Sequence, residues 1–470
     1  MERFIKIGDV KAVKSSMVQK SSWGLGFEKL DRDAFDPANA YDKVADSGIK
    51  WARIQSGWAK TEKVKGVYDF AWLDSIVDNL KLRGIAPWMC ICYGNGLYNK
   101  RAAEVYGCVG CPPIENEEEK VAWLKYVEAV IKHFQDRVEW FEIWNEPDYI
   151  SCWKTGVNGT DYGIFLRDTA IKIRETSAKV KIIGGSTTVQ DLAWLTDVIN
   201  TGALQYIDAY SYHSYSFDER LSWYQVKALK SLCLRANPDL LFIQGETGTQ
   251  SRSDGAGGLS GGAWTPVRQA KCLARVLLGH TLNGVFINSF FSCMDMIEAL
   301  DGKVGDKNSY MDFGYFGVLG ADFDENGMAT GEYRPKLSYR TLQVLSAIFR
   351  EDFSVEDLPV RLVSKFYSPR LFRNDDMLTD VITYGVRKPN DSSAFIYWKP
   401  TELLSTSYEA TISIEAAGIK GEIRLVNLLD GNIYEIPEKY IERNSNGAVI
   451  LKNMPLLDYP LMITFGDFVQ

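Results

Sequence analysis

The chain has 470 residues, of which 46% are hydrophobic and 13% aromatic. This composition excludes a disordered protein and is sufficient for a large core and a smaller second domain. The formal net charge of −8 is spread along the chain without a basic stripe, and no apolar run is long enough to cross a bilayer, so we expect neither a nucleic-acid nor a membrane partner.

The chain begins with "MERFIKIGDVKAVK", which contains no apolar stretch of signal-peptide length. We therefore expect a cytoplasmic protein, with a secreted form whose signal was trimmed as the alternative. The eight scattered cysteines also suit a reducing compartment. Cys108 and Cys111 form one C-x-x-C pair, but a zinc site needs a second pair of ligands and the chain has only three histidines. We expect loop thiols or a local disulfide there, and no metal or cofactor.

Eight segments have the composition of buried strands, and the segments between them have helical periodicity. The predicted strands are 23–27, 51–56, 86–94, 139–146, 179–185, 208–215, 240–246 and 284–292, and the clearest predicted helices are 68–84, 117–134, 264–284 and 335–349. Strands that are apolar on both faces and alternate with helices indicate a parallel sheet. Eight such units within about 330 residues indicate a (β/α)8 TIM barrel with insertions. A doubly wound sheet is the alternative, but no G-x-G-x-x-G motif follows the first strand.

The pattern changes near residue 355. Short strands separated by turn residues follow, without helices, in segments 380–388, 393–400, 408–418, 422–436 and 459–467. This arrangement is typical of a β-sandwich. We therefore predict an α/β barrel domain over residues 19–354 and a β-sandwich over 355–470, to which residues 1–18 add a strand.

Polar residues gather at the predicted C-terminal ends of the barrel strands, where such barrels carry their chemistry. The fourth strand ends in Asn145 and Glu146, and the seventh ends in Glu246. The others are Arg53 and Trp58 near the end of the second strand, which we expect to bind the substrate, and His213 and Tyr215 at the end of the sixth. Two glutamates facing each other across the mouth suit glycoside hydrolysis, in which one protonates the leaving oxygen and the other attacks the anomeric carbon or activates a water. A carboxyl separation of about 5–5.5 Å would give retention of configuration.

Four further expectations concern the carboxylates, the end of the fourth strand and a histidine. Glu142 lies earlier in the fourth strand, and we interpret it as a buried, paired support rather than as the catalytic acid. Because strict alternation would point Asn145 away from Glu146, we expect a bulge or an irregular strand end there. An ionised Glu246 nearby should raise the pKa of Glu146. His280 ends a predicted helix, and we interpret it as a partner of the helix dipole.

The segments "FEIWNEPD" and "FIQGETG", about one hundred residues apart, resemble clan A of the glycoside hydrolases, the retaining (β/α)8 barrels. The resemblance implies that Glu146 is the acid/base, Asn145 the partner of the sugar 2-hydroxyl and Glu246 the nucleophile. The segment "YHSY" is similar to the clan's strand-six motif, which implies that His213 and Tyr215 contact the sugar and the nucleophile. Residues 57–74, "GWAKTEKVKGVYDFAWLD", are similar to the clan's β-xylosidase/α-iduronidase family.

The sequence also departs from the clan. A Trp often ends strand eight there, whereas this chain has "INSFFSCMD", so the sugar platform would be Phe290, Trp264 or Trp58. "GETG" differs from the usual xylosidase pattern, which leaves β-xylosides, β-glucosides and β-galactosides open. Long loops at 95–116, 247–264 and 293–332 predict a closed pocket and exo action on a carbohydrate substrate. The alternatives are an endo-acting β-glycanase and a non-catalytic carbohydrate-binding barrel, which should have lost one of the two glutamates.

Overall fold

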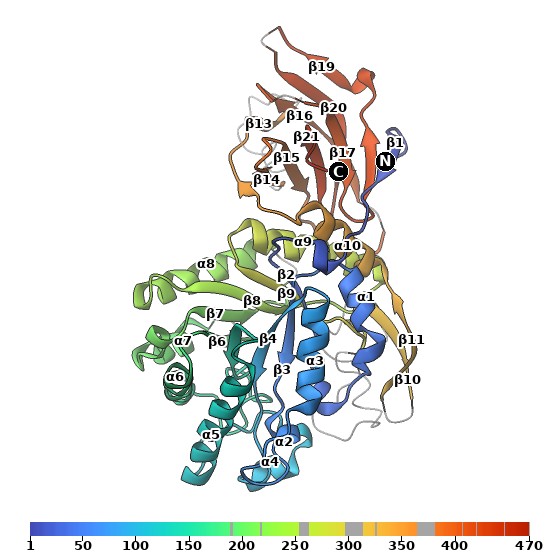
Figure 1. Ribbon diagram of the computed structural model, residues 1–470. Coiled ribbons are helices and arrows are strands. Elements are labelled where there is room, and N and C mark those ends of the chain that lie inside the picture. Colours follow the sequence, from blue (N-terminus) through green and yellow to red (C-terminus); the bar gives the residue numbers. More distant parts are fainter. Residues whose placement is uncertain are drawn as a thin grey trace.

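The computed structural model describes residues 1–188, 191–216, 219–252, 263–296, 314–324, 327–363, 381–406, 408–419, 421–445 and 447–469. Eight parallel strands close into a barrel in chain order (Figure 1). They are β2 Trp23–Gly26, β3 Trp51–Gln55, β4 Ala86–Ile91, β5 Trp140–Ile143, β6 Lys181–Thr187, β7 Ala209–His213, β8 Leu241–Thr247 and β9 Ile287–Phe290. Each lies on its predicted segment, and the predicted barrel is confirmed.

Helices surround the barrel. They are α1 Tyr41–Asp46, α2 Trp58–Thr61, α3 Ala71–Leu82, α4 Lys100–Glu104, α5 Glu117–Phe134, α6 Gly159–Thr176, α7 Leu192–Asn200, α8 Glu219–Ala236, α9 Pro266–Leu282 and α10 Leu337–Ile348. Local sequence explains where the longest begin. The Asn116 side chain caps α5 in a reciprocal pair with Glu119, and the Thr265 hydroxyl caps α9 ahead of Pro266. No helix in the described ranges is long and apolar enough to cross a membrane.

Two antiparallel sheets form the second part of the molecule (Figure 1). The larger has the order β1-β18-β17-β21-β15-β14-β12 and the smaller β13-β16-β20-β19. The strands are β1 Ile5–Asp9, β12 Ser354–Val355, β13 Val360–Val363, β14 Ile382–Arg387, β15 Ser393–Trp398, β16 Glu409–Ala416, β17 Ile423–Asn427, β18 Asn432–Glu435, β19 Ile441–Arg443, β20 Val449–Leu457 and β21 Leu461–Phe465. A hairpin of β10 Leu319–Phe323 and β11 Ala329–Pro335 precedes α10.

The two sheets share a core, as in a β-sandwich. Phe395 and Ile463 of the larger sheet belong to the same buried cluster as Ile414 and Leu451 of the smaller one. The N-terminal strand β1 pairs with β18. We propose the domain division just before Ser354, one residue earlier than predicted, because β12 pairs with β14, with β1 on the sandwich side.

Helix α9, which follows β8 in the chain, is enclosed by the barrel and the sandwich, and its side chains are buried on all sides. Its Lys271 makes a buried ion pair with Asp458 at 2.8 Å. Its Arg275 pairs with Glu219 of α8 and donates to the Thr401 carbonyl at 2.9 Å. Buried charges tolerate little displacement once they are paired, so the sandwich fixes the helix that follows one of the candidate catalytic strands.

His280, in the last turn of α9, is not the helix-dipole partner that we predicted. The ring is buried, and the Tyr212 hydroxyl lies 2.9 Å from its Nδ1. Burial, and then the charge of Lys230, lower the pKa of His280 to about 4. A dipole partner is expected to hold the proton, so the interpretation is wrong, because desolvation outweighs the dipole at this site.

The buried His280 should make the fold sensitive to mild acid. Between about pH 6.5 and 4 the unfolded chain binds a proton at this position that the folded chain does not, so stability is present above that window and is lost as the pH falls through it. The loss should be on the order of 3 kcal/mol, at about 1.4 kcal/mol per pH unit. Urea titrations across this range should show a shallower loss for His280→Gln than for the wild type. Identical slopes would contradict the expectation.

Candidate active site

The strand that carries Glu146 ends irregularly, as predicted. β5 stops at Ile143, and both Trp144 (φ +70°) and Glu146 (φ +49°) have left-handed backbone conformations. These turns break the alternation of side chains, so Asn145 and Glu146 both contribute to the same buried polar cluster. The Trp144 indole donates to the Cys152 carbonyl at 2.9 Å, which fixes the turn from the following loop.

Glu246 lies at the end of β8, and two side chains orient it. Arg53 Nη1 donates to its Oε1 at 2.5 Å, and the Tyr215 hydroxyl donates to its Oε2 at 2.9 Å. Gly245 makes this packing possible, because a Cβ there would lie 2.4 Å from Ser211 Oγ and 3.1 Å from His213 Nε2. The Glu246 carboxylate is thus held by the permanently charged guanidinium of Arg53 and by the hydroxyl of Tyr215.

The two candidate catalytic carboxylates lie close together. One carboxylate oxygen of Glu146, one of Glu246 and a ring nitrogen of His213 all lie within 4.8 Å of one another. His213 is fully buried, with Nδ1 2.8 Å from Glu146 Oε1 and 3.6 Å from Glu246 Oε2. Its Nε2 lies 3.1 Å from Ser186 Oγ. Burial lowers the pKa of His213, but Glu246 and Glu146 outweigh burial, so the net shift is upward.

Glu146 is set up to hold a proton. Burial raises its pKa, the bond from His213 opposes that effect, and the charge of Glu246 adds to it. The net shift is upward, as an acid that donates near neutral pH requires. The shift agrees in direction with the prediction, although burial rather than Glu246 is its largest cause. Cys152 Sγ lies 3.5 Å from the second carboxylate oxygen.

Arg53 is the centre of the cluster, and its role differs from the predicted substrate contact. It is fully buried, and all five of its N–H donors have protein acceptors. These acceptors are Glu142 at 2.6 Å, Glu28 at 3.0 Å, Glu246 at 2.5 Å, Asn145 at 2.8 Å and Ser186 at 3.1 Å. No donor is left for a sugar hydroxyl, so the substrate-binding prediction for Arg53 is wrong. Arg53 instead positions the residues around it.

Asn145 and Glu142 take the positions that we expected. Asn145 accepts from Arg53 and donates to the Tyr93 hydroxyl at 2.9 Å, which fixes the orientation of its amide. Glu142 is fully buried and accepts from Arg53 Nε and from Ser186 Oγ at 2.7 Å. Burial raises the pKa of Glu142, but Arg53 outweighs burial and the net shift is downward. Glu142 is therefore a paired support, as predicted.

Two of the predicted sugar platforms are corrected. Trp58 is buried and stacks with Tyr98 and Tyr126 at 5.5 Å between ring centroids, and its indole donates to Glu62. Phe290 has no exposed surface. Neither ring presents a face to a sugar, because each is packed into the core. Trp264 is also buried, with the Arg268 guanidinium 4.4 Å from its ring centroid, and its role as a platform stays a prediction.

The structure also refines the prediction for the sixth-strand pair. Tyr215 is half-buried and donates to Glu246, and the predicted role of Glu246 as the nucleophile stays a prediction. Burial, and then the charge of Glu246, raise the pKa of Tyr215 far above its usual range, so its hydroxyl keeps its proton. His213 has no exposed surface and contacts Glu146 and Glu246, and its predicted contact with the sugar stays a prediction.

Three residues of this cluster escaped the sequence analysis: Glu28, Cys152 and Ser186. Glu28 and Ser186 lie at the ends of β2 and β6, so a full inventory of polar residues at strand ends would have found them. Cys152 lies six residues after Glu146, in a loop with no recognisable signal. The eight cysteines are free, so Cys108 and Cys111 form no local disulfide.

Glu146, His213 and Glu246 also have the composition of a cation site. Their polar atoms already have protein partners, however, and Arg53 places a positive charge directly on Glu246. A metal ion at that position would be repelled by the guanidinium. The arrangement therefore fits an acid–base pair better than a metal centre.

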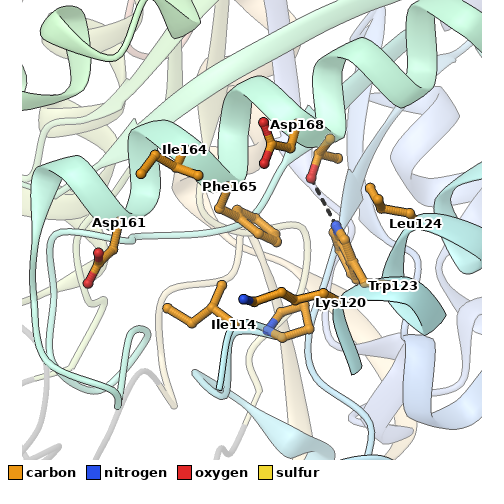
Figure 2. A pocket seen from close by; sticks show the side chains of 10 residues that line it. Ile114, Lys120, Trp123, Leu124, Asp161, Ile164, Phe165 and Asp168 are labelled. Carbon is orange, nitrogen blue, oxygen red and sulfur yellow. Dashed lines mark hydrogen bonds between the residues drawn. The ribbon is translucent and has the colours of Figure 1, made fainter. Parts of the chain in front are cut away.

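A hollow of about 350 Å³ lies elsewhere, between α5 and α6 (Figure 2). Trp123 of α5 donates to Thr169 of α6 at 2.9 Å across it, and Lys120 and Asp161 also line it. None of the predicted site residues is among its lining residues. We therefore assign it no part in the chemistry of the carboxylate pair.

Comparisons with known proteins find similarity to glycoside hydrolases. The model of "Glycosyl hydrolases family 39" matches residues 43–230, a range that contains Glu146 and His213 but ends before Glu246. Over 165 residues the chain is 25% identical to a β-xylosidase of Geobacillus stearothermophilus, covering 33% of this chain and 32% of that enzyme. The aligned part thus spans about a third of the length of this curated relative.

The fold resembles solved glycoside hydrolases along nearly the whole chain. A family 39 glycoside hydrolase from Bacteroides cellulosilyticus WH2 has a TM-score of 0.67 at 16% identity, covering 97% of this chain and 83% of that one. A family 39 β-xylosidase from Caulobacter crescentus has a TM-score of 0.57 at 16% identity, covering 97% and 98%. At such identities the structures show the fold alone. With the family match and the β-xylosidase relative, they confirm the predicted resemblance to clan A of the glycoside hydrolases.

Proposed function

We propose that the protein is a retaining glycoside hydrolase that acts on β-linked glycosides, with Glu146 as the acid/base and Glu246 as the nucleophile. The observation that carries the proposal is the pair itself, with oxygens within 4.8 Å of each other at the ends of β5 and β8. That distance supports the retaining geometry of about 5–5.5 Å rather than the inverting range of about 6.5–9.5 Å, which leaves room for a water.

The two carboxyls have the different environments that double displacement requires. In the first step Glu246 attacks the anomeric carbon while Glu146 gives its proton to the leaving oxygen, and a covalent glycosyl-enzyme forms. The raised pKa of Glu146 keeps that proton available. In the second step Glu146, now ionised, removes a proton from water, which attacks the same carbon and releases Glu246.

The surrounding side chains orient the two carboxyl groups. Arg53 and Tyr215 hold Glu246 in one orientation for attack, and His213 holds Glu146. We propose that the amide of Asn145, which Arg53 and Tyr93 fix in orientation, bonds to the sugar 2-hydroxyl, where bonds strengthen in the transition state.

For the substrate we propose β-xylosides, because the curated relative is a β-xylosidase. Exo action remains part of the proposal. It rests on the long loops after the third, seventh and eighth strands, of which residues 253–262, 297–313 and 325–326 lie outside the described residues.

A panel of 4-nitrophenyl β-xyloside, β-glucoside and β-galactoside tests the proposal. We expect the highest kcat/KM for the xyloside, and proton NMR of the fresh product should show the β-anomer first, because two displacements restore the configuration. Chromatography of a digested xylo-oligosaccharide should show xylose from the first time point. Release of longer fragments would indicate endo action, and the α-anomer as first product would exclude double displacement.

A further inference from the structure

Glu28 shares the guanidinium that holds Glu246. It lies two residues beyond the end of β2 and is almost fully buried. Arg53 Nη1 donates to Glu28 Oε1 at 3.0 Å, and the same nitrogen donates to Glu246 Oε1 at 2.5 Å. A change in the charge or position of the Glu28 carboxyl therefore alters the hydrogen bond from Arg53 Nη1 to Glu246.

The cluster contains more acids than one cation can balance. Glu28, Glu142 and Glu246 all accept from Arg53, which carries one positive charge. His213 is shared between Glu146 and Glu246, and Lys29 adds only the weakest of the attractions at Glu28. Three ionised carboxylates around one guanidinium would leave uncompensated negative charge in a buried site, which is strongly unfavourable. One of the three is therefore expected to be neutral.

The contacts identify Glu28 as that group. Glu142 accepts from Arg53 at 2.6 Å and from Ser186 at 2.7 Å, and Glu246 accepts from Arg53 at 2.5 Å and from Tyr215 at 2.9 Å. In the described part of the chain Glu28 accepts one such bond, from Arg53, at the 3.0 Å of an ordinary neutral bond.

The groups that face Glu28 favour its neutral form. Burial, and then the charge of Glu246, raise the pKa of Glu28 to about 8, against the attraction of Arg53 and Lys29. Among the described residues, Tyr215 and the Cys293 thiol also lie near Glu28; burial raises the pKa of both, so neither carries a charge near neutral pH.

We propose that Glu28 is a positioning residue for Glu246 that works as a neutral carboxylic acid. This inference rests on the proposed function, in which Glu246 is the nucleophile. The neutral acid fills one N–H of Arg53 and leaves the guanidinium charge to Glu246 and Glu142. When Glu28 loses its proton at alkaline pH, it competes for Nη1 and repels Glu246, which weakens the hold on the attacking carboxylate.

The test is the pH dependence of inactivation by 2,4-dinitrophenyl 2-deoxy-2-fluoro-β-xyloside. Its leaving group needs no protonation, so the titration of Glu146 does not shape the profile. The wild-type rate constant should be level near about pH 6 and about tenfold or more lower near pH 9.5. Glu28→Ala should lose about tenfold throughout, because Arg53 loses an acceptor. Glu28→Gln, which reproduces the neutral acid, should restore the rate at the lower pH and abolish the alkaline fall.

Glu142→Gln is the matched control, because it neutralises an ionised partner of the same guanidinium. We expect it to lose about 100-fold or more at every pH, without restoring the alkaline rate. The proposal is overturned if Glu28→Gln keeps the wild-type alkaline fall, or if folded Glu28→Gln is as damaged as Glu142→Gln at about pH 6.

Infrared difference spectroscopy separates this inference from the proposed function. The wild type should lose a protonated-carboxyl C=O band between about pH 6 and 9.5 that Glu28→Gln lacks. This readout needs no turnover. Labelling of a residue other than Glu246 would overturn the proposed function, whereas the absence of the band would overturn the inference alone.

Discussion

Replacing Glu246 with alanine should lower kcat by about 10⁵-fold, the scale expected when an enzyme loses its nucleophile. Without the attacking carboxylate no glycosyl-enzyme can form, so the lost transition-state stabilisation is about 7 kcal/mol. Substrate binding should persist, because Asn145 keeps its contacts to Arg53 and Tyr93. Steady-state kinetics and equilibrium binding of the unreacted xyloside measure the two effects separately.

A chemical readout makes this prediction specific. A 2-fluoro-β-xyloside should label the wild type on the peptide that contains "FIQGETGTQ", which mass spectrometry of the digest locates. Azide should restore some turnover to Glu246→Ala by direct attack and give the α-glycosyl azide. Asp239→Ala, an exposed carboxylate at the opposite end of the same strand, is the matched control and should be fully active. A label on Glu142 or Asp295 would mean that another carboxylate is the nucleophile.

Replacing Glu146 with alanine should separate substrates by their leaving groups. Loss of general acid catalysis is worth about 10²–10⁴-fold, and the full loss should appear for alkyl xylosides and xylobiose, whose leaving oxygen needs a proton. For 2,4-dinitrophenyl xyloside the first step should hardly change, and the glycosyl-enzyme should accumulate because no base activates water. A burst followed by slow turnover is the expected time course.

Azide distinguishes this variant from the previous one. It should speed turnover of the glycosyl-enzyme in Glu146→Ala and give the β-glycosyl azide, because the first displacement by Glu246 still takes place. Glu139→Ala, exposed at the opposite end of the segment that carries Glu146, is the control. Equal losses for good and poor leaving groups, without azide rescue, would exclude Glu146 as the acid/base.

Local sequence patterns were enough for the framework. Eight apolar runs separated by amphipathic helices specify a parallel barrel, because strands that are apolar on both faces must be covered on both sides. That topology places the ends of β5 and β8 at the same mouth, so Glu146 and Glu246 could be paired although they are one hundred residues apart. The irregular end at Asn145 followed from the same periodicity, since a period of two cannot send neighbouring residues to one side.

The sequence did not show which aromatic residues pack into the core. We predicted Trp58, Phe290 or Trp264 as the sugar platform because this chain lacks the Trp that often ends strand eight in the clan it resembles. An indole or phenyl ring has the same composition whether it packs in a core or faces a ligand. Only the neighbours decide, and for Trp58 these are Tyr98 and Tyr126, which come from other segments of the chain.

What the sequence by itself determined is the pair of carboxylates and the barrel that presents them. What only the tertiary structure decided is how they are held and charged. Arg53 joins acceptors from β5, β6, β8 and the segment after β2, and no local pattern encodes such a set of distances. Protonation of Glu28 and Glu146 depends on burial and on charges brought together by folding, because desolvation and Coulomb energy depend on position in space rather than on order in the chain.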